Sequence, residues 1–122
     1  MAAVRTRNTG AEKAVRSLVH RLGYRYSLKR SDLPGRPDLA FVSRRKVIFV
    51  HGCFWHGHSC RYGHLPKSRL NYWRPKIAAN KARDRRQAAR LMKDGWSVLT
   101  IWQCQLKKEP LTEARIRGFL DE

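Results

Sequence analysis

The sequence predicts one mixed α/β domain spanning residues 1–122, in which a mixed β-sheet is flanked by α-helices. A chain of 122 residues has the length of a single domain. Hydrophobic residues make up 42% of it, enough for one modest core. Apolar spacing indicates the order helix, strand pair, helix, strand, helix.

The first helix is predicted to begin at Thr9 and to stop at Gly23. Thr9 and Glu12 have the spacing of a capping box, whose hydroxyl and carboxylate satisfy amides of the first turn. Helical spacing relates the apolar residues Ala11, Ala14, Val15, Leu18, Val19 and Leu22. Residues 24–28 are a candidate short strand, and residues 32–38 contain two prolines and a glycine that predict a loop.

The central and C-terminal elements follow from the same patterns. Residues 39–42 and 46–50 are strand candidates around a basic turn, whereas residues 51–71 have no regular period. A basic helix is predicted over residues 74–94, then a strand over 96–102 and a last helix capped by Thr112. The basic helix is expected to turn one set toward the core, Ile77, Ala78, Ala88, Leu91 and Met92, and another outward, Lys81, Arg83, Arg85, Arg86 and Arg90. The last helix would bury Ile116, Phe119 and Leu120.

Charge points to a polyanionic partner. Lysine and arginine number 27 against 9 acidic residues, so the formal net charge is +18. Nucleic acid is the leading candidate and an anionic membrane surface the second. No apolar run is long enough for a membrane helix, and no signal peptide is recognisable. We therefore expect a cytoplasmic protein.

Cysteine and histidine gather in one short segment. Cys53 and Cys60 enclose His56 and His58, and Cys104 follows the last predicted strand. Zinc favours tetrahedral thiolate and imidazole ligands, so these cysteines and one histidine would form a structural zinc site. Spacing does not choose between the two histidines. The alternative is three buried structural cysteines with histidines nearby by coincidence.

A second set of polar residues suggests phosphodiester chemistry. Asp38 stands at the start of a predicted strand, where a carboxylate can hold a divalent metal beside a phosphate. His51 and His56 could act as a general base or as phosphate ligands. Glu12 and Asp84 stand out as acids on otherwise basic helices. Each acid also has an ordinary interpretation: loop closure for Asp38, helix capping for Glu12, and an ion pair with arginine for Asp84.

Phe54 and Trp55 are adjacent aromatic residues in the Cys/His segment. Because neighbouring side chains of an extended loop point in different directions, we expect at least one ring to be exposed. Exposed rings among cations would stack on bases or wedge into a duplex. Packing of both rings around the metal loop is the alternative.

Taken together, these residues resemble the very short patch repair (Vsr) endonucleases. The resemblance is carried by residues 34–38, 47–56, 83–86 and 95–96, it is strongest over 49–60, and it extends over nearly the whole chain. It implies a restriction-endonuclease-like fold and an enzyme that nicks DNA 5′ of the thymine in a T:G mismatch. Such mismatches arise when 5-methylcytosine deaminates.

The resemblance also implies individual roles. Asp38 and the backbone carbonyl of Val50 would hold catalytic magnesium, a hard ion that prefers oxygen ligands. His56 would be the general base and His51 would contact the scissile phosphate. The remaining implied roles are orientation of His56 or water by Glu12 and Asp84, zinc ligation by Cys53, His58, Cys60 and Cys104, and insertion beside the mismatch by Phe54 and Trp55.

Two departures and three alternatives accompany this interpretation. Val50 stands where a small hydroxyl residue such as threonine is expected, and the chain begins at Met1 without the N-terminal arm usual in the family. The alternatives are a nuclease of the same fold with another target, a zinc-stabilised DNA-binding module, and a ribosome-associated basic protein. We expect a monomer, because a single mismatch lacks two-fold symmetry. Downstream repair proteins are possible partners.

Overall fold

The computed structural model describes residues 9–28, 30–60, 65 and 67–122, and it has three layers. A four-stranded sheet has the order β1-β2-β3-β4. Strand β1 (Ser27–Leu28) pairs antiparallel with β2 (Leu39–Phe41), β2 pairs antiparallel with β3 (Lys46–His51), and β3 pairs parallel with β4 (Ser97–Trp102). The sheet is therefore mixed, as the sequence predicts.

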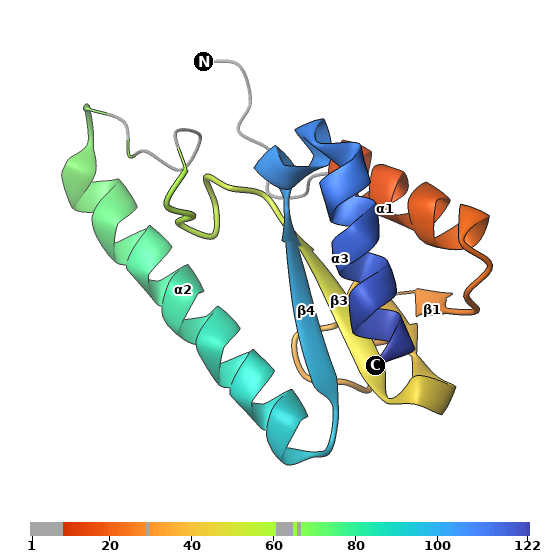
Figure 1. Ribbon diagram of the computed structural model, residues 1–122. Coiled ribbons are helices and arrows are strands. Elements are labelled where there is room, and N and C mark those ends of the chain that lie inside the picture. The colour runs from red at the N-terminus through yellow and green to blue at the C-terminus, as the bar shows by residue number, and fades with distance from the viewer. Residues whose placement is uncertain (1–8, 29, 61–64, 66) are drawn as a thin grey trace.

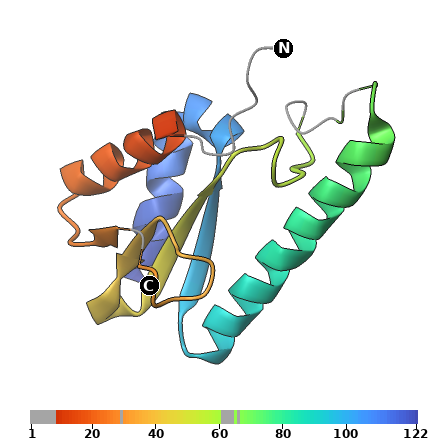
Figure 2. The same ribbon diagram turned by 180° about the vertical axis from the view of Figure 1, so that it is seen from behind.

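Helices cover both faces of this sheet (Figures 1 and 2). Helices α1 (Thr9–Arg21) and α3 (Glu109–Asp121) lie on one face, and α2 (Leu70–Lys93) lies alone on the other. One core cluster joins α1 and α3 to Leu39, Ile48 and Ile101 of the sheet. A smaller cluster joins Leu91 of α2 to the opposite sheet face. Among the described residues, no helix has the length and apolar character needed to cross a membrane.

Helix α1 confirms most of its predicted apolar stripe. Ala11, Val15, Leu18 and Val19 are buried, Leu22 is partly buried, and Ala14 is exposed. Gly23 adopts φ +88° just after the helix, a conformation that favours glycine. The side chain of Thr9 lies outside the described part of the chain, so the capping box stays a prediction.

The connection between β2 and β3 is one residue longer than predicted, because β2 ends at Phe41. Val42 belongs to a short 3-10 helix, η1 (Val42–Arg44), and not to β2. Arg45 then takes a left-handed conformation with φ 54°, which reverses the chain into β3. All six residues of β3 are buried, because helices cover both faces of this strand. Strand β3 also runs one residue further than predicted, to His51.

Helix α2 begins at Leu70, one turn before the predicted start, and contains Pro75. The extra turn carries Trp73, which packs against the rings of Phe54 and Trp55. Of the predicted core residues, Ile77 and Leu91 are buried and Ala88 is partly buried, but Ala78 and Met92 are exposed. The reason is geometric: a single helix on a sheet face buries only a narrow stripe, and each successive residue turns by about 100°.

Helix α3 also begins earlier than predicted, at Glu109. Thr112 is therefore not its N-cap but a buried interior residue, whose hydroxyl donates to the carbonyl of Gln105 at 2.7 Å. Pro110 stands in the first turn, where proline is tolerated because its missing N–H has no helical partner. The predicted core residues Ile116 and Leu120 are buried and Phe119 is partly buried.

Candidate active site and metal centre

The ends of β3 and β4 define the position of the site. These strands are parallel, and His51 and Trp102 are partners at their carboxyl ends. The chain continues from His51 into the loop 52–60, and from Trp102 into the 3-10 helix η3 (Gln103–Lys107). Two segments that are far apart in sequence therefore emerge side by side from one edge of the sheet.

Helix α2 contributes Asp84 to this place. Ile77 and Leu91 are the buried residues of α2, and Asp84 lies seven residues from each. Seven residues make nearly two helical turns, so all three side chains share the face that packs on the sheet. The sequence analysis singled out Asp84 only as an acid on an otherwise basic helix, and its seven-residue spacing from Ile77 and Leu91 is the further signal that places it on the buried face.

His51, His56 and Asp84 meet at this point. Their ligand atoms lie within 4.8 Å of one another. The imidazoles of His51 and His56 stack with ring centroids 3.8 Å apart and an interplanar angle of 3°. Nδ1 of His56 is 2.5 Å from Oδ2 of Asp84. Three residues from β3, the loop and α2 thus form one compact polar group.

Electrostatics assigns a charge state to two members of the group. Burial, helped by the neighbouring His56 ring, lowers the pKa of His51 to about 4, so His51 is neutral near pH 7. Burial alone raises the pKa of Asp84, but the hydrogen bond from His56 and the electrostatic interactions with the His56, His51 and Arg83 side chains outweigh it and lower this pKa below its usual value. Asp84 is therefore ionised, and the proton of its hydrogen bond to His56 resides on Nδ1 of the imidazole.

A pocket of about 410 Å³ opens at these side chains, between α2 and the sheet. His51, His56 and Asp84 line it, together with Phe49 and Thr100 from the neighbouring strands. Lys81 and Arg85 of α2 also line it and add positive charge. The pocket can therefore receive an anionic group beside an imidazole.

Asp38 lies close by, but it is not one of the residues that line the pocket. Its Oδ2 accepts a hydrogen bond of 2.6 Å from the backbone N–H of Val50. This hydrogen bond holds the Asp38 carboxylate beside the end of β3, at the residue that precedes His51. Glu12 lies in the first turn of α1 and is partly buried. Neither acid belongs to the group formed by His51, His56 and Asp84.

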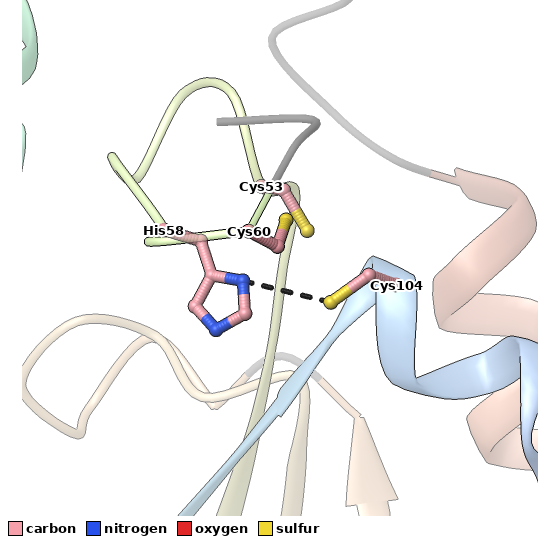
Figure 3. Close-up of side chains that lie close together, drawn as sticks. All are labelled: Cys53, His58, Cys60 and Cys104. Atoms are coloured by element: carbon pink, nitrogen blue, oxygen red, sulfur yellow. Dashed lines mark hydrogen bonds between the residues drawn. The ribbon is translucent and has the colours of Figure 1, made fainter. Parts of the chain in front are cut away.

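The Cys/His cluster consists of Cys53, His58, Cys60 and Cys104, and its four ligand atoms lie within 4.8 Å of one another. Figure 3 shows the four side chains converging from the loop and from the start of η3. The three cysteines are free of disulfides, and Cys53 is fully buried. His56 is not part of this cluster, although it stands only two residues from His58.

The cluster has the chemistry and dimensions of a zinc site. Three thiols and one imidazole are a structural zinc donor set. Nδ1 of His58 lies 3.5 Å from Sγ of Cys104. Typical zinc–sulfur and zinc–nitrogen bonds at a tetrahedral angle separate these ligands by roughly 3.5 Å. Burial raises the pKa of the Cys53 thiol to about 12, so the thiol is protonated near pH 7. A bound cation would displace this proton and stabilise the thiolate. The cluster could therefore hold zinc.

Phe54 and Trp55 are both partly buried, which corrects the expectation that one ring would be exposed. They contact each other edge to face, and both contact Trp73, with centroids 5.0 Å and 5.6 Å from its ring. Tyr72, which is exposed, contacts Trp73 in turn. Lys76 lies 5.7 Å from the Trp55 ring. The rings therefore pack against the first turns of α2 beside a lysine. This cluster depends on contacts between the loop and α2, which are distant in sequence.

Sequence reasoning missed two aromatic residues of this region. Trp73 lay between the irregular segment 51–71 and the helix predicted from residue 74, and Trp102 was assigned only as the end of a strand. Trp102 contacts the rings of His51, His56 and His58. Its partnership with His51 depends on the parallel pairing of β3 and β4, which no local pattern reveals.

Comparison with known proteins agrees with the architecture and the motifs. The sequence model of the family described as DNA mismatch endonuclease Vsr matches residues 1–62. The chain is 61% identical over 121 residues to the type II nicking enzyme V.XorIIP of Xanthomonas oryzae pv. oryzae, covering 99% of this chain and 89% of the relative. It is 42% identical over 123 residues to the DNA mismatch endonuclease Vsr of Escherichia coli, covering 100% of this chain and 79% of the relative.

A solved structure shares the fold. The catalytic domain of the homing endonuclease I-Bth0305I superposes with a TM-score of 0.62 and 17% identity, covering 89% of this chain and 91% of that one. The restriction-endonuclease-like, mixed α/β fold expected from the sequence is therefore present. With its family motifs and whole-length relatives, the chain belongs to the DNA mismatch endonuclease Vsr family and is a DNA endonuclease.

Proposed function

We propose that this protein nicks one strand of duplex DNA on the 5′ side of the thymine in a T:G mismatch and thereby initiates very short patch repair. The observation that carries the proposal is the Asp84–His56 hydrogen bond beside His51, in a pocket that Lys81 and Arg85 make basic. The whole-length relatives named as a mismatch endonuclease and as a nicking enzyme support it.

His56 is the general base in this proposal. Ionised Asp84 accepts the hydrogen bond from Nδ1, so in the neutral imidazole the proton stays on that nitrogen and Nε2 carries the lone pair. Nε2 can then take a proton from the water that attacks phosphorus. A histidine oriented by a carboxylate in this way remains in one tautomer, which is the arrangement general-base catalysis requires.

His51 contacts the scissile phosphate. It is neutral near pH 7, and its Nδ1 is buried without a hydrogen-bond partner among the described residues. A neutral imidazole beside a phosphate can donate a hydrogen bond without repelling a protonated neighbour. This division of roles suits two stacked rings, because only one of them takes up the proton of the water.

Asp38 and the backbone carbonyl of Val50 would hold magnesium. The N–H and C=O of one strand residue point to the same side, and the N–H of Val50 already points to Asp38. Two oxygens can therefore face one ion, and the valine side chain does not interfere because it packs in the core. When bound, magnesium would polarise the phosphate and stabilise the charge that develops on its oxygens. Glu12 is proposed to orient His56 or bound water.

Phe54 and Trp55 are the residues proposed to enter the duplex beside the mismatch. Their packing with Trp73 and the nearby Lys76 combines apolar surface with positive charge, as wedging side chains of DNA-binding proteins do. A mispaired step is the least costly to unstack, so a wedge adds selectivity for mismatches. Zinc on the Cys/His cluster is proposed to hold the loop that carries both rings.

A single-turnover nicking assay with magnesium tests the proposal. It compares a labelled duplex containing one T:G mismatch with the same duplex containing T:A or C:G, for wild type and Asp38→Ala. We expect a nick 5′ of the mismatched thymine that Asp38→Ala does not make. The control variant is Asp32→Ala, because Asp32 is an exposed acid in the preceding loop, paired with Arg30.

Two outcomes would contradict the proposal. Equal cutting of fully paired DNA would leave a nuclease of the same fold with another target. Tight binding without cutting in several mismatch contexts would instead favour a zinc-stabilised DNA-binding module.

The same samples address the proposed monomeric state by sedimentation with and without DNA. The cytoplasmic, nucleoid-associated location and the downstream repair partners remain proposals for work in cells.

A further inference from the structure

Trp102 touches both functional centres at once. It is the last residue of β4, it is partly buried, and it lines the pocket. Its indole stacks on the ring of His58 with centroids 4.2 Å apart and planes 15° apart. The same indole meets the rings of His51 and His56 edge to face, at 5.2 Å and 6.3 Å. The residue thus lies between the Cys/His cluster and the proposed catalytic pair.

The orientation of His51 depends on ring packing. Nδ1 of His51 is buried and has no hydrogen-bond partner in the described part of the chain. The rings of Phe49, His56 and Trp102 surround it, at 5.6 Å, 3.8 Å and 5.2 Å. Phe49 belongs to the same strand as His51, and His56 belongs to the loop 52–60, whose position itself has to be fixed. Trp102 is therefore the neighbour that fixes the ring of His51 from the adjacent strand.

The loop is held to β4 through the same residue. His58 stacks on Trp102, and Cys104, two residues further, lies 3.5 Å from Nδ1 of His58. His56 precedes His58 by two residues, so a movement of His58 displaces His56 as well. Phe49, Thr100 and Trp102 form a row on the sheet side of the pocket, and Trp102 is the member of that row that reaches the loop.

We propose that Trp102 is a positioning residue, which holds His51 and His56 in the geometry for nicking by packing them against His58 of the Cys/His cluster. This inference rests on the proposed function, because it assumes that His51 and His56 act on the phosphate. Trp102 itself needs no contact with DNA. Its loss should reduce the rate of the chemical step and leave DNA affinity nearly unchanged.

Two variants of Trp102 and one control test this. Trp102→Leu removes the ring and Trp102→Phe retains a smaller one. In single-turnover nicking of T:G duplex at saturating protein, we expect Trp102→Leu to be about 10- to 100-fold slower and Trp102→Phe to be within about fivefold of wild type, because small displacements of reacting groups cost rates of this order. The dissociation constant for the duplex should change less than about threefold in both variants, since no phosphate contact is lost.

Trp96→Leu is the matched control. Trp96 is a partly buried tryptophan that packs with the core cluster of Leu91, beside Arg45. We expect Trp96→Leu to lower the melting temperature but to leave the nicking rate of the folded protein close to that of wild type. Zinc content and circular dichroism are measured for every variant. A Trp102→Leu rate equal to that of wild type, or a loss confined to DNA affinity, would overturn the inference.

Histidine ring resonances provide a readout that is independent of activity. An indole shifts the ring protons of its aromatic neighbours, so Trp102→Leu and Trp102→Phe should move the signals of His51, His56 and His58, and Trp96→Leu should not. Unmoved His51 and His56 signals in folded Trp102→Phe would overturn the inference even if Trp102→Leu does not fold. A wild-type protein that nicks no DNA would count against the proposed function, whereas these signals would still test the packing.

Discussion

The hydrogen bond between His56 and Asp84 is the residue-scale interaction on which the proposed chemistry depends. The two groups come from the loop and from α2, and each is partly buried, with 19% and 17% of the side chain exposed. Limited access of water makes such a charge-assisted bond stronger than it is at the surface. The bond fixes both the tautomer and the direction of the imidazole.

Replacing Asp84 tests this role directly. The asparagine of Asp84→Asn can still form a hydrogen bond with His56. Because an amide can donate as well as accept, it no longer fixes the imidazole proton on Nδ1. We expect the single-turnover nicking rate to fall by about 10²- to 10⁴-fold, the range for loss of an oriented general base. Duplex affinity should persist. Asp94→Asn, which changes an exposed acid just after the same helix, is the control. Equal rates for both variants would contradict the assignment.

The buried imidazole of His51 predicts a pH dependence of stability. Its pKa is about 4 in the folded protein and 6.5 ordinarily, so the unfolded chain binds the proton first. Stability from neutral His51 is complete above pH 6.5 and is lost as pH falls toward 4. As pH falls from about 7.5 to about 5, this group should lower the free energy of unfolding by about 2 kcal/mol.

Urea unfolding at the two pH values measures this effect. Other groups, the thiols of the Cys/His cluster included, also take up protons in acid. The comparison is therefore made with His51→Phe, which keeps an aromatic ring but cannot titrate. We expect the wild type to lose more stability than the variant by that amount. Equal losses would mean that His51 is not held neutral in the folded state.

At the scale of elements, the packing of the loop 52–60 against α2 decides where His56 stands. Gly57 has φ +62° and lies against α2. A Cβ built at this position would be 2.6 Å from Cδ of Lys81 and 2.8 Å from Cγ2 of Ile77. Both the backbone conformation and the close approach therefore require glycine. This glycine lies between His56 of the catalytic pair and His58 of the Cys/His cluster.

Gly57→Ala should separate the loop from the helix. We expect a loss of about 1–3 kcal/mol in the free energy of unfolding, from strain and overpacking, together with slower nicking. Gly23→Ala is the matched control, because Gly23 also has positive φ (+88°) but a Cβ there meets nothing within 4 Å. Thermal unfolding and the nicking assay distinguish the two. Unchanged nicking in Gly57→Ala would show that the loop position does not matter.

At the scale of the whole molecule, the Cys/His cluster connects parts of the chain that the core does not join. Cys53 and Cys60 belong to the loop, whereas Cys104 belongs to η3 beyond β4. Neither core cluster of the described residues includes a residue of the loop 52–60, so the apolar core does not tie this loop to η3. A metal ion there would supply the missing cross-link.

Removal of metal tests that contribution. We expect purified protein to contain one zinc per chain, and a strong chelator to lower the melting temperature by several degrees, since each kcal/mol lost shifts it by about 4 °C in a domain of this size. The thiols should become reactive at the same time. Cys104→Ser should reproduce most of the effect. A melting temperature insensitive to chelator, with no zinc in the protein, would contradict the assignment.

Local patterns in the sequence were sufficient for the order of the main helices and strands, but not for all of their ends. The spacing of apolar residues in α1 and the prolines before Asp38 act within one or two turns of the chain, so they can be interpreted without a structure. The starts of α2 and α3 were misplaced because long-range contacts decide them. Trp73 packs against Phe54 and Trp55, and Thr112 bonds to the carbonyl of Gln105. Local spacing contains no information about either contact.

The sequence by itself determined the mixed α/β class, the strongly basic character and the residue types available for metal and phosphate chemistry. The resemblance to the Vsr endonucleases implied Asp84 beside His56 and His58 with the three cysteines, and the tertiary structure brings each of these groups together. Only the tertiary structure decided that the rings of His51 and His56 stack and that Trp102 lies between the two groups. The physical reason is that parallel pairing of β3 with β4 brings residues 51 and 102 together. Such pairing depends on packing of the whole sheet and helices, and not on any neighbouring residues in the chain.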